Sequence, residues 1–321
     1  MRAIMTKICK YYLGIDLGGT FIKGGIVDGE GKILLRDKVP TESEKGSDGV
    51  VSNIVSLCRS LMEKLDISVS DLVGVGMGIP GTVDSERGEV VYANNLGWQN
   101  FVITDKISKA LGLPVKIAND ASVAVLGESR FGCGKGYRHV VMITLGTGVG
   151  GGLLLDGKLF EGNRSAGGEL GHMVIVKDGE PCTCGRRGCI EAYASVTALI
   201  RDTKRAMEKN PESKLWEIGT PDAVTGKTAF DYLEKDQTAK AVVDRYLEMV
   251  GVSIVNMANL IRPEIIILGG GICAEGERLL RPLREMLARE IHGGDTGPAV
   301  KIETAALGND AGLLGAAALL M

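Results

Sequence analysis

The sequence is poor in aromatic residues, proline and histidine. Aromatic residues make up 4% of the 321-residue chain, which holds only 9 prolines and 3 histidines. So few rings leave little surface on which nucleic-acid bases could stack. The formal net charge of −3 also provides no basic surface for a phosphate backbone. We therefore expect no nucleic-acid partner.

Long apolar runs and a disulfide pattern are missing as well. No run reaches the length of about 18 apolar residues that crosses a membrane. Residues 1–12 lack the sustained apolar core of a signal peptide. The seven cysteines are an odd number, and three of them crowd between residues 182 and 189, unlike a disulfide scaffold. These features predict a cytoplasmic protein without a membrane partner.

Glycine, in contrast, is abundant. The chain contains 46 glycines, twice the usual share of about 7%. Glycine is costly to order, so an excess predicts tight turns or places where the backbone approaches a ligand. The glycines follow no three-residue period, which excludes collagen. The length predicts about two domains of roughly 150 residues each.

Strand-like and helix-like segments alternate along the chain. Short apolar runs predict the strands, and apolar residues at helical spacing predict the helices. Such alternation is typical of an α/β architecture with buried, partly parallel strands. The expected strands are 11–16, 21–28, 32–39, 73–79, 114–119, 139–145 and 264–269, and the expected helices are 49–65, 121–130, 239–261 and 310–320.

One long internal repeat indicates a duplication. Residues 13–34 and 143–160 share the order strand, glycine turn, strand, Asp-Gly turn and strand. A period this long predicts two similar domains with a cleft between them, although similar hairpins also recur by chance. We expect a smaller domain of residues 1–120 plus about 305–321, and a larger one of 121–304.

The first glycine turn, D-L-G-G-T at 16–20, is a candidate phosphate site. The N–H groups of Gly18 and Gly19 can approach phosphate oxygens, and Thr20 adds a hydroxyl. Asp16 ends a strand, where its carboxylate can hold a metal–phosphate through water, and Lys23 supplies positive charge. An ordinary β-hairpin turn explains the same residues equally well.

Two later glycine turns also follow strands. Residues 146–151 match the dinucleotide pattern G-x-G-x-x-G, but a strand and not a helix follows, which argues against a Rossmann site. Residues 269–271 leave room for a flat ligand against the backbone. Residues 226–228 (G-K-T) lack the other P-loop glycine and a preceding strand, so we expect a surface loop. The three turns that follow strands suggest one nucleotide gripped from both sides.

Asn119 and Asp120 lie between a predicted strand and a predicted helix. A polar residue at that place can be a helix N-cap. The functional alternative makes Asp120 a general base for a hydroxyl group, with Asn119 orienting it.

A cluster of metal-binding residue types lies between residues 169 and 191. His172, Cys182, Cys184 and Cys189 provide one imidazole and three thiolates, the donors of a closed tetrahedral zinc site. Such a site leaves no position for catalytic water, so the zinc is expected to be structural. Glu169 and Glu191 bracket the cluster as acids and not as ligands. Buried or redox cysteines are the alternative.

Taken together, these motifs resemble the ROK family (repressor, ORF, kinase), and particularly its bacterial glucokinases. The resemblance covers essentially the whole chain, and the E-x-G-H and C-x-C-G-x-x-G-C-x-E motifs in this order are highly specific. The matching segments are DLGGT (16–20), GIPG (78–81), NNLGW (94–98), NDA (119–121), LGTGVGGG (145–152), ELGH (169–172), CTCGRRGCIE (182–191) and ILGGG (267–271).

The resemblance implies an actin-like ATPase fold, a duplicated ribonuclease H-like α/β fold with two domains flanking a cleft. It implies that Asp120 takes the proton from a sugar hydroxyl, and that the second nitrogen of His172 faces the sugar. The implied sugar contacts are Gly81, Asn94, Asn119, Asp120, Glu169, His172 and Glu191. The implied nucleotide contacts are Asp16, Gly18, Gly19, Thr20, Lys23, Gly146, Thr147, Gly148, Gly270 and Gly271.

The activity that the resemblance implies is phosphoryl transfer from ATP, with Mg²⁺, to the 6-hydroxyl of glucose. Relatives of this family that act on N-acetylmannosamine, N-acetylglucosamine, fructose or allose, or that use polyphosphate, are close alternatives. A sugar-responsive repressor is a remote one, because only 15 residues precede Asp16, too few for a helix-turn-helix segment. The resemblance also implies a structural Zn²⁺ and a homodimer.

Overall fold

The computed structural model describes residues 10–321, apart from the side chain of Asp295. Contacts divide the chain into two compact units. Unit 1 comprises the chain up to Gly136, Gly152–Gly168 and Ala306–Met321, and unit 2 comprises Tyr137–Gly151 and Glu169–Ala305. The domain boundaries expected near residues 120 and 305 stay a prediction. Residues 1–9, which include Cys9 and most of the N-terminal segment without a signal-peptide core, lie outside the described residues.

The sheet of unit 1 has five strands in the order β3-β2-β1-β4-β8. β1 pairs antiparallel with β2 and parallel with β4, and β4 pairs parallel with β8. The strands are β1 (Tyr11–Leu17), β2 (Phe21–Val27), β3 (Ile33–Pro40), β4 (Leu72–Ile79) and β8 (Val115–Asn119). All five were predicted from the sequence.

The position of each strand in this sheet follows from its sequence. β4 (LVGVGMGI) is buried at nearly every residue, as expected for a central parallel strand covered on both faces. β3 lies at the edge and carries the charged run Arg36–Lys38. Charges along an edge strand discourage pairing with another chain.

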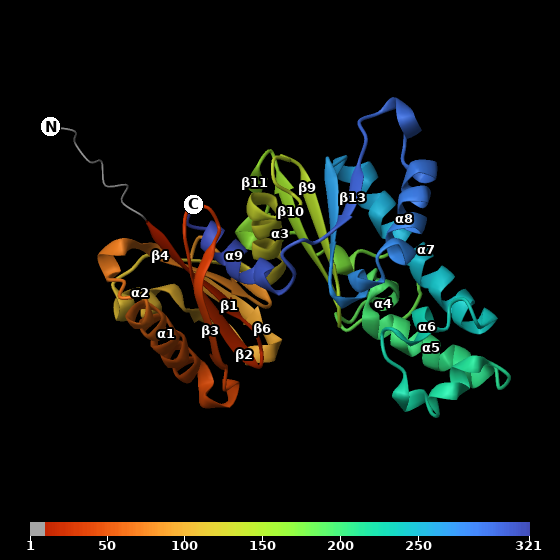
Figure 1. Cartoon of the computed structure of the whole chain (residues 1–321), viewed down its shortest axis with the longest axis horizontal. Coiled ribbons are helices and arrows are strands. Elements are labelled where there is room, and N and C mark those ends of the chain that lie inside the picture. The colour runs from red at the N-terminus through yellow and green to blue at the C-terminus, as the bar shows by residue number, and fades with distance from the viewer. Residues whose placement is uncertain (1–9) are drawn as a thin grey trace. The chain divides into compact units, whose positions relative to one another are not determined.

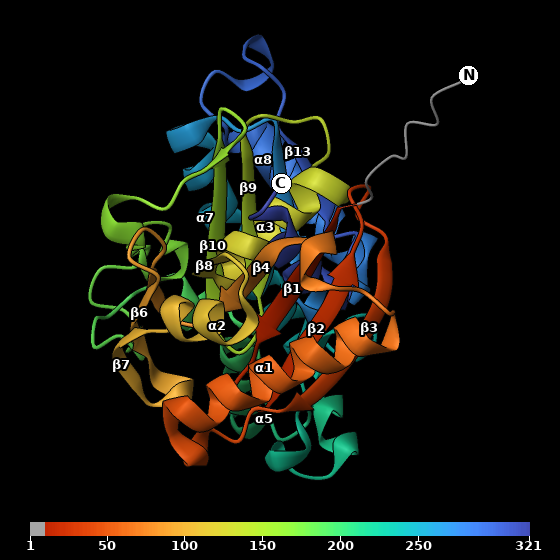
Figure 2. The same cartoon turned by 90° about the vertical axis from the view of Figure 1, so that its left-hand side faces the viewer.

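Helices cover both faces of this sheet. α1 (Gly46–Lys64) lies across β2 and β3, as Figure 2 shows. α9 (Ala311–Ala318) packs against β1, β4 and α3 (Asp120–Phe131), which lie beside it in Figure 1. The C-terminal segment predicted to be helical therefore belongs to unit 1. A shorter helix, α2 (Thr104–Leu111), precedes β8.

A small three-stranded sheet was not predicted. It consists of β5 (Thr82–Asp84), β6 (Glu89–Ala93) and β7 (Trp98–Val102) in the order β5-β6-β7. These strands have three to five residues each, too short for an alternating pattern to be visible. β5 begins directly after Gly81, and the Asn94–Leu96 turn joins β6 to β7.

The second five-stranded sheet repeats the plan of the first, in the order β11-β10-β9-β12-β13. β12 pairs parallel with both β9 and β13. The predicted duplication is therefore confirmed at the level of strand order. The strands are β9 (Val140–Leu145), β10 (Val149–Leu155), β11 (Lys158–Leu159), β12 (Ile265–Gly269) and β13 (Lys301–Thr304).

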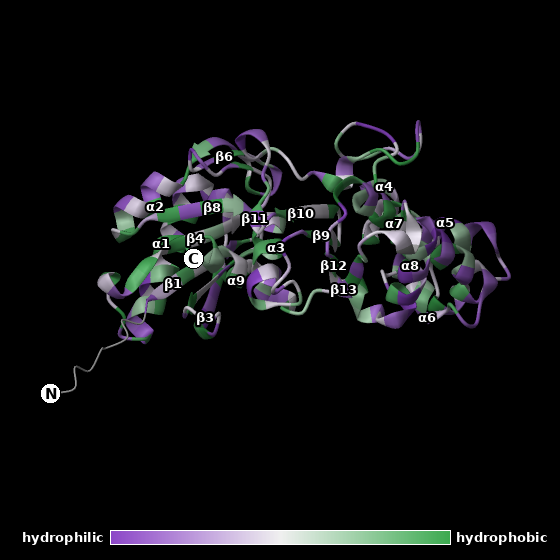
Figure 3. Cartoon of the chain, turned by 90° about the horizontal axis from the view of Figure 1, so that it is seen from above, coloured by the Kyte–Doolittle hydropathy of each residue, from purple (hydrophilic) through white to green (hydrophobic). Residues whose placement is uncertain are grey.

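Unit 2 also contains α-helices, and α5 carries both green and purple residues in Figure 3, as expected for a helix with one apolar and one polar face. The helices are α4 (Glu191–Ala194), α5 (Val196–Lys209), α6 (Thr228–Asp231), α7 (Gln237–Ile261) and α8 (Glu277–Glu290). The expectation of a surface loop at 226–228 was partly wrong, because buried Thr228 begins α6. Among residues 10–321, no helix is long and apolar enough to cross a membrane.

Candidate functional site

The Asn119–Asp120 pair stands where β8 ends and α3 begins. Asn119 is the N-cap of α3, and its side-chain oxygen accepts hydrogen bonds from Ala121 N at 2.9 Å and Ser122 N at 3.4 Å. Asp120 is exposed, and one of its carboxylate oxygens accepts from Ala121 N at 2.8 Å. The capping interpretation of Asn119 is thus confirmed, and it leaves the adjacent carboxylate rigidly placed in the first turn of the helix.

Asn119 also reaches a second predicted sugar contact. Its Nδ2 donates to the carbonyl oxygen of Gly81 at 2.9 Å. Gly81 has φ +103°, and a Cβ there would lie 2.2 Å from the carbonyl oxygen of Tyr92, so only glycine fits. Asn94 is exposed, and its Oδ1 accepts a hydrogen bond from the Tyr92 hydroxyl at 3.2 Å.

The first glycine turn joins β1 to β2. Gly18 N donates across the turn to Phe21 O at 3.0 Å, so this N–H is already used within the protein. Buried Thr41 donates its hydroxyl to Gly18 O at 2.6 Å. Lys23 Nζ lies 3.0 Å from Asp16 Oδ2, so the lysine and carboxylate predicted to serve the phosphates form an ion pair. Thr41 lies outside the D-L-G-G-T motif and was not among the site residues predicted from the sequence.

The second glycine turn joins β9 to β10 and is held in a similar way. Thr197, near the start of α5, donates its hydroxyl to Thr147 O at 2.7 Å. Val196 N donates to Gly146 O at 2.8 Å. As predicted, strand β10 follows this turn, which excludes the Rossmann arrangement there.

The third glycine turn lies beside the second. β12 and β9 are parallel neighbours, with Gly269 opposite Thr144, so Gly270 follows at the same edge of the sheet. Gly270 has φ +105°, and a Cβ there would lie 2.0 Å from Leu145 O. The backbone of the predicted adenine turn therefore approaches the base of the predicted phosphate turn.

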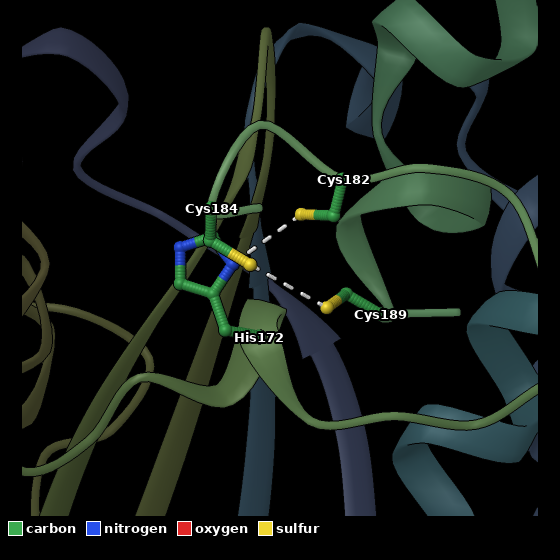
Figure 4. Close-up of side chains that lie close together, drawn as sticks. All are labelled: His172, Cys182, Cys184 and Cys189. Atoms are coloured by element: carbon green, nitrogen blue, oxygen red, sulfur yellow. Dashed lines mark hydrogen bonds between the residues drawn. The ribbon is translucent and has the colours of Figure 1, made fainter. Parts of the chain in front are cut away.

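The predicted metal ligands come together. The donor atoms of His172, Cys182, Cys184 and Cys189 all lie within 4.8 Å of one another. Figure 4 shows the three sulfur atoms and the imidazole directed toward one point. His172 Nδ1 lies 3.6 Å from Cys182 Sγ, and Cys184 Sγ lies 3.7 Å from Cys189 Sγ. Since Nδ1 faces the sulfurs, Nε2 is the ring nitrogen that remains for another ligand.

The thiols of this cluster have shifted acidities. Burial and the neighbouring sulfur atoms raise the pKa of Cys189 to about 12. The backbone N–H of Arg186 lowers the pKa of Cys184. Three sulfur atoms this close disfavour several thiolates at once unless a cation compensates their charge.

Glu191 connects the metal cluster with the second glycine turn. It is the first residue of α4, and its Oε2 accepts from Val149 N at 3.1 Å. Its Oε1 accepts from the hydroxyl of Thr183, within the cysteine loop, at 2.8 Å and lies 3.6 Å from Cys182 Sγ. Glu169 is exposed, and its carbonyl oxygen accepts from His172 N at 3.1 Å.

Comparison with known proteins agrees with the motifs. The model of the "ROK family" matches residues 12–321. The chain belongs to the ROK family. It is 39% identical over 314 residues to a glucokinase of Streptomyces coelicolor, covering 96% of each chain. It is 37% identical over 311 residues to a glucokinase of Thermotoga maritima, again covering 96% of each.

A solved ROK structure is similar over the same length. The ROK family glucokinase from Streptomyces griseus, in complex with glucose and AMPPNP, is 38% identical with a TM-score of 0.79. The match covers 96% of this chain and 98% of that one. The actin-like ATPase fold predicted from the sequence is thereby confirmed.

The predicted ROK site residues are divided between the two units. Unit 1 holds the first glycine turn, Gly81, Asn94, Asn119 and Asp120, and unit 2 holds the other two turns, the metal cluster, Glu169 and Glu191. Within unit 1, a Cβ on Gly19 would lie 3.4 Å from Cβ of Asn95, the neighbour of Asn94. Thr41, Asn95 and Thr197 were not singled out from the sequence. Asn95 stands in the NNLGW motif, whereas no sequence signal marks the two threonines.

Proposed function

We propose that this protein is an ATP-dependent glucokinase that transfers the γ-phosphate of ATP to the 6-hydroxyl of glucose. The observation that carries the proposal is the full-length similarity to a glucokinase solved with glucose and AMPPNP. The motifs named above provide a carboxylate for the sugar hydroxyl and glycine turns for the nucleotide.

Asp120 is the proposed general base. Phosphoryl transfer depends mainly on positioning and charge stabilisation, and the base accepts the hydroxyl proton as the new O–P bond forms. The Asp120 carboxylate is exposed, so a sugar can reach it, while Asn119 fixes the backbone beside it through the helix cap and the Gly81 bond. Gly81, Asn94, Glu169, His172 and Glu191 are the proposed contacts that orient the sugar.

The glycine turns are the proposed phosphate and adenine contacts. The hydroxyl groups of Thr41 and Thr197 tie down carbonyl oxygens of the first two turns. These bonds keep the turns in shape before the nucleotide binds, which favours preorganised electrostatic stabilisation. Asp16 has the carboxylate oxygen chemistry that Mg²⁺ prefers. When bound, Mg²⁺ supplies charge neutralisation at the phosphate oxygens.

The cysteine cluster fits a structural zinc ion. Tetrahedral zinc, with bonds of about 2.3 Å to sulfur and about 2.0 Å to nitrogen, sets two sulfurs about 3.8 Å apart and sulfur and nitrogen about 3.6 Å apart. The distances of 3.7 and 3.6 Å support this arrangement. With four protein ligands, the ion would hold the loop that carries Thr183 and leave Glu191 and Nε2 of His172 for the sugar.

A panel of sugars in an ADP-release assay tests the function. We expect glucose to give the highest kcat/KM among glucose, mannose, fructose, allose, N-acetylglucosamine and N-acetylmannosamine, with product phosphorylated at the 6-hydroxyl by NMR. A parallel series with polyphosphate in place of ATP, followed by product formation, identifies the donor. A higher kcat/KM for another sugar would replace glucose as the substrate, and turnover of none would reject the kinase assignment.

We also propose a homodimer, as the family resemblance implies. Sedimentation equilibrium should give twice the chain mass of 33.9 kDa. A mass equal to one chain at micromolar concentration would contradict it.

A further inference from the structure

Residues 161–168 lead from β11 to Glu169 through an unfavourable backbone conformation. Arg164 has φ +51° and Ser165 has φ +54°, two consecutive non-glycine residues in the left-handed region. The left-handed conformation is unfavourable for a residue with a Cβ, so two such residues in succession require support from their surroundings. The supports lie on the segment that ends β5, at Asp84 and Ser85.

Asp84 holds the first strained residue. Its side chain is only 2% exposed, and its Oδ2 lies 3.1 Å from Arg164 Nε. Its Oδ1 accepts a hydrogen bond from Arg87 N at 3.1 Å. A buried carboxylate needs charge and hydrogen-bond partners, so leaving the Arg164 bond would be costly. The ion pair thus favours the left-handed conformation of Arg164.

Ser85 holds the second strained residue through a chain of three hydrogen bonds. Ser85 N donates to Ser165 Oγ at 3.2 Å, and the two hydroxyl oxygens lie 2.8 Å apart. Ser85 Oγ donates to Glu161 Oε2 at 2.9 Å. Because Ser85 Oγ gives its hydrogen to Glu161, Ser165 Oγ must donate to Ser85 Oγ. Each hydroxyl therefore both donates and accepts, which fixes the direction of the whole chain.

Asp84 and Ser85, the two anchors of loop 161–168, lie close in sequence to one predicted sugar contact, Gly81, and hold the loop that leads to another, Glu169. β5 begins directly after Gly81, whose carbonyl accepts from Asn119, and ends at Asp84. The anchored loop ends at Gly168, directly before Glu169. We propose that Asp84 and Ser85 are positioning residues that hold loop 161–168 in its strained conformation and thereby set Glu169 for the sugar. This inference rests on the proposed function for the role of Glu169.

Steady-state kinetics of four variants test the proposal. Asp84→Asn, Ser85→Ala and Ser165→Ala should each raise KM for glucose about tenfold, with kcat and KM for ATP within about twofold of the wild type. The double variant Ser85→Ala/Ser165→Ala should match the worse single variant, because both act through the same hydrogen-bond chain. Ser70→Ala removes an exposed serine–serine bond elsewhere in unit 1 and is the matched control.

Hydrogen exchange of the sugar-free protein gives a second readout. Amides of residues 162–170 should exchange at least tenfold faster in the three single variants, while those of β1 and β4 stay protected. Lower melting temperatures with an unchanged KM for glucose would overturn the proposal, since the anchors would then be structural only. Unchanged exchange would overturn it as well.

The same experiment separates this inference from the proposed function. If the wild type phosphorylates another sugar of the panel, KM for that sugar replaces KM for glucose. If the wild type phosphorylates none, the proposed function fails, and the role assigned to Glu169 fails with it. The exchange readout still decides whether Asp84 and Ser85 hold the loop.

Discussion

The carboxylate of Glu191 accepts a hydrogen bond from the backbone N–H of Val149 at 3.1 Å. Its other oxygen accepts from Thr183, within the cysteine loop, at 2.8 Å. One side chain therefore joins the metal loop to the strand that follows the second glycine turn. Since Glu191 is also a proposed sugar contact, the sugar, the phosphates and the metal loop depend on the same group.

Replacing Glu191 by glutamine should therefore affect both substrates. One amide position of Gln must carry an NH₂ group, which cannot accept the hydrogen bond that Val149 N or Thr183 Oγ1 donates. We expect KM to rise about tenfold for glucose and also for ATP, which corresponds to about 1.4 kcal/mol each. Glu169→Gln, the matched control at an exposed proposed sugar contact, should raise KM for glucose alone. Steady-state kinetics with each substrate varied in turn would contradict the coupling if Glu191→Gln changed only the glucose value.

Replacing Asp120 by asparagine should remove the general base. The amide keeps the shape of the side chain but cannot take a proton, so kcat should fall by about 10² to 10⁴. Glucose binding measured by titration calorimetry should stay within about threefold of the wild type. Asp105→Asn, at an exposed first-turn position of α2, is the control and should leave kcat unchanged. Normal turnover in Asp120→Asn would reject the assignment of the base.

Much of the fold was visible in the sequence because its signals are local. The glycine turns, the apolar runs and the repeat predicted the strands of the two five-stranded sheets apart from β13, and they predicted the duplication. α7 was expected from residue 239 but begins two residues earlier, at Gln237, because Asp236 is its N-cap. The three-stranded sheet was missed, because β5 to β7 are short and their pairing depends on long-range contacts and not on periodicity.

The site was predicted only as far as motifs extend. Residue type and spacing identified the four metal ligands, and the structure brings them together. The supports of the site, Thr41, Thr197, Asp84 and Ser85, act on backbone carbonyls or on a distant loop. Contacts between residues 23 to 80 positions apart leave no pattern in one sequence.

Removing the metal should loosen the cysteine loop. We expect one zinc ion per chain by elemental analysis, and Cys184→Ser should lose it. Because the ligands bracket Thr183 and lie beside Glu191, the variant should also bind glucose at least tenfold more weakly. Cys58→Ala is the control, because Cys58 lies in the core of unit 1 and outside the metal cluster, and this variant should keep its zinc. Freshly purified wild-type protein without metal would contradict the zinc site.

Asp236 should make stability depend on pH in the acid range. Burial alone would raise its pKa, but the N–H groups of Ala239 and Lys214 and the hydroxyl of Ser213 outweigh it, so the pKa lies below 3.8. Because the pKa is lower in the folded state, the ionised carboxylate stabilises the fold at every pH above the unfolded-state pKa. This contribution is lost as the pH falls through the folded-state pKa. The difference in unfolding free energy between wild type and Asp236→Asn, measured by urea titration, should be constant between about pH 6 and 8. The carboxyl group is ionised there in both the folded and the unfolded state, because the pKa of an unperturbed Asp is about 3.9. It should shrink below about pH 4. A difference that is the same at pH 3 and pH 7 would show that the carboxylate charge contributes nothing to the cap of α7.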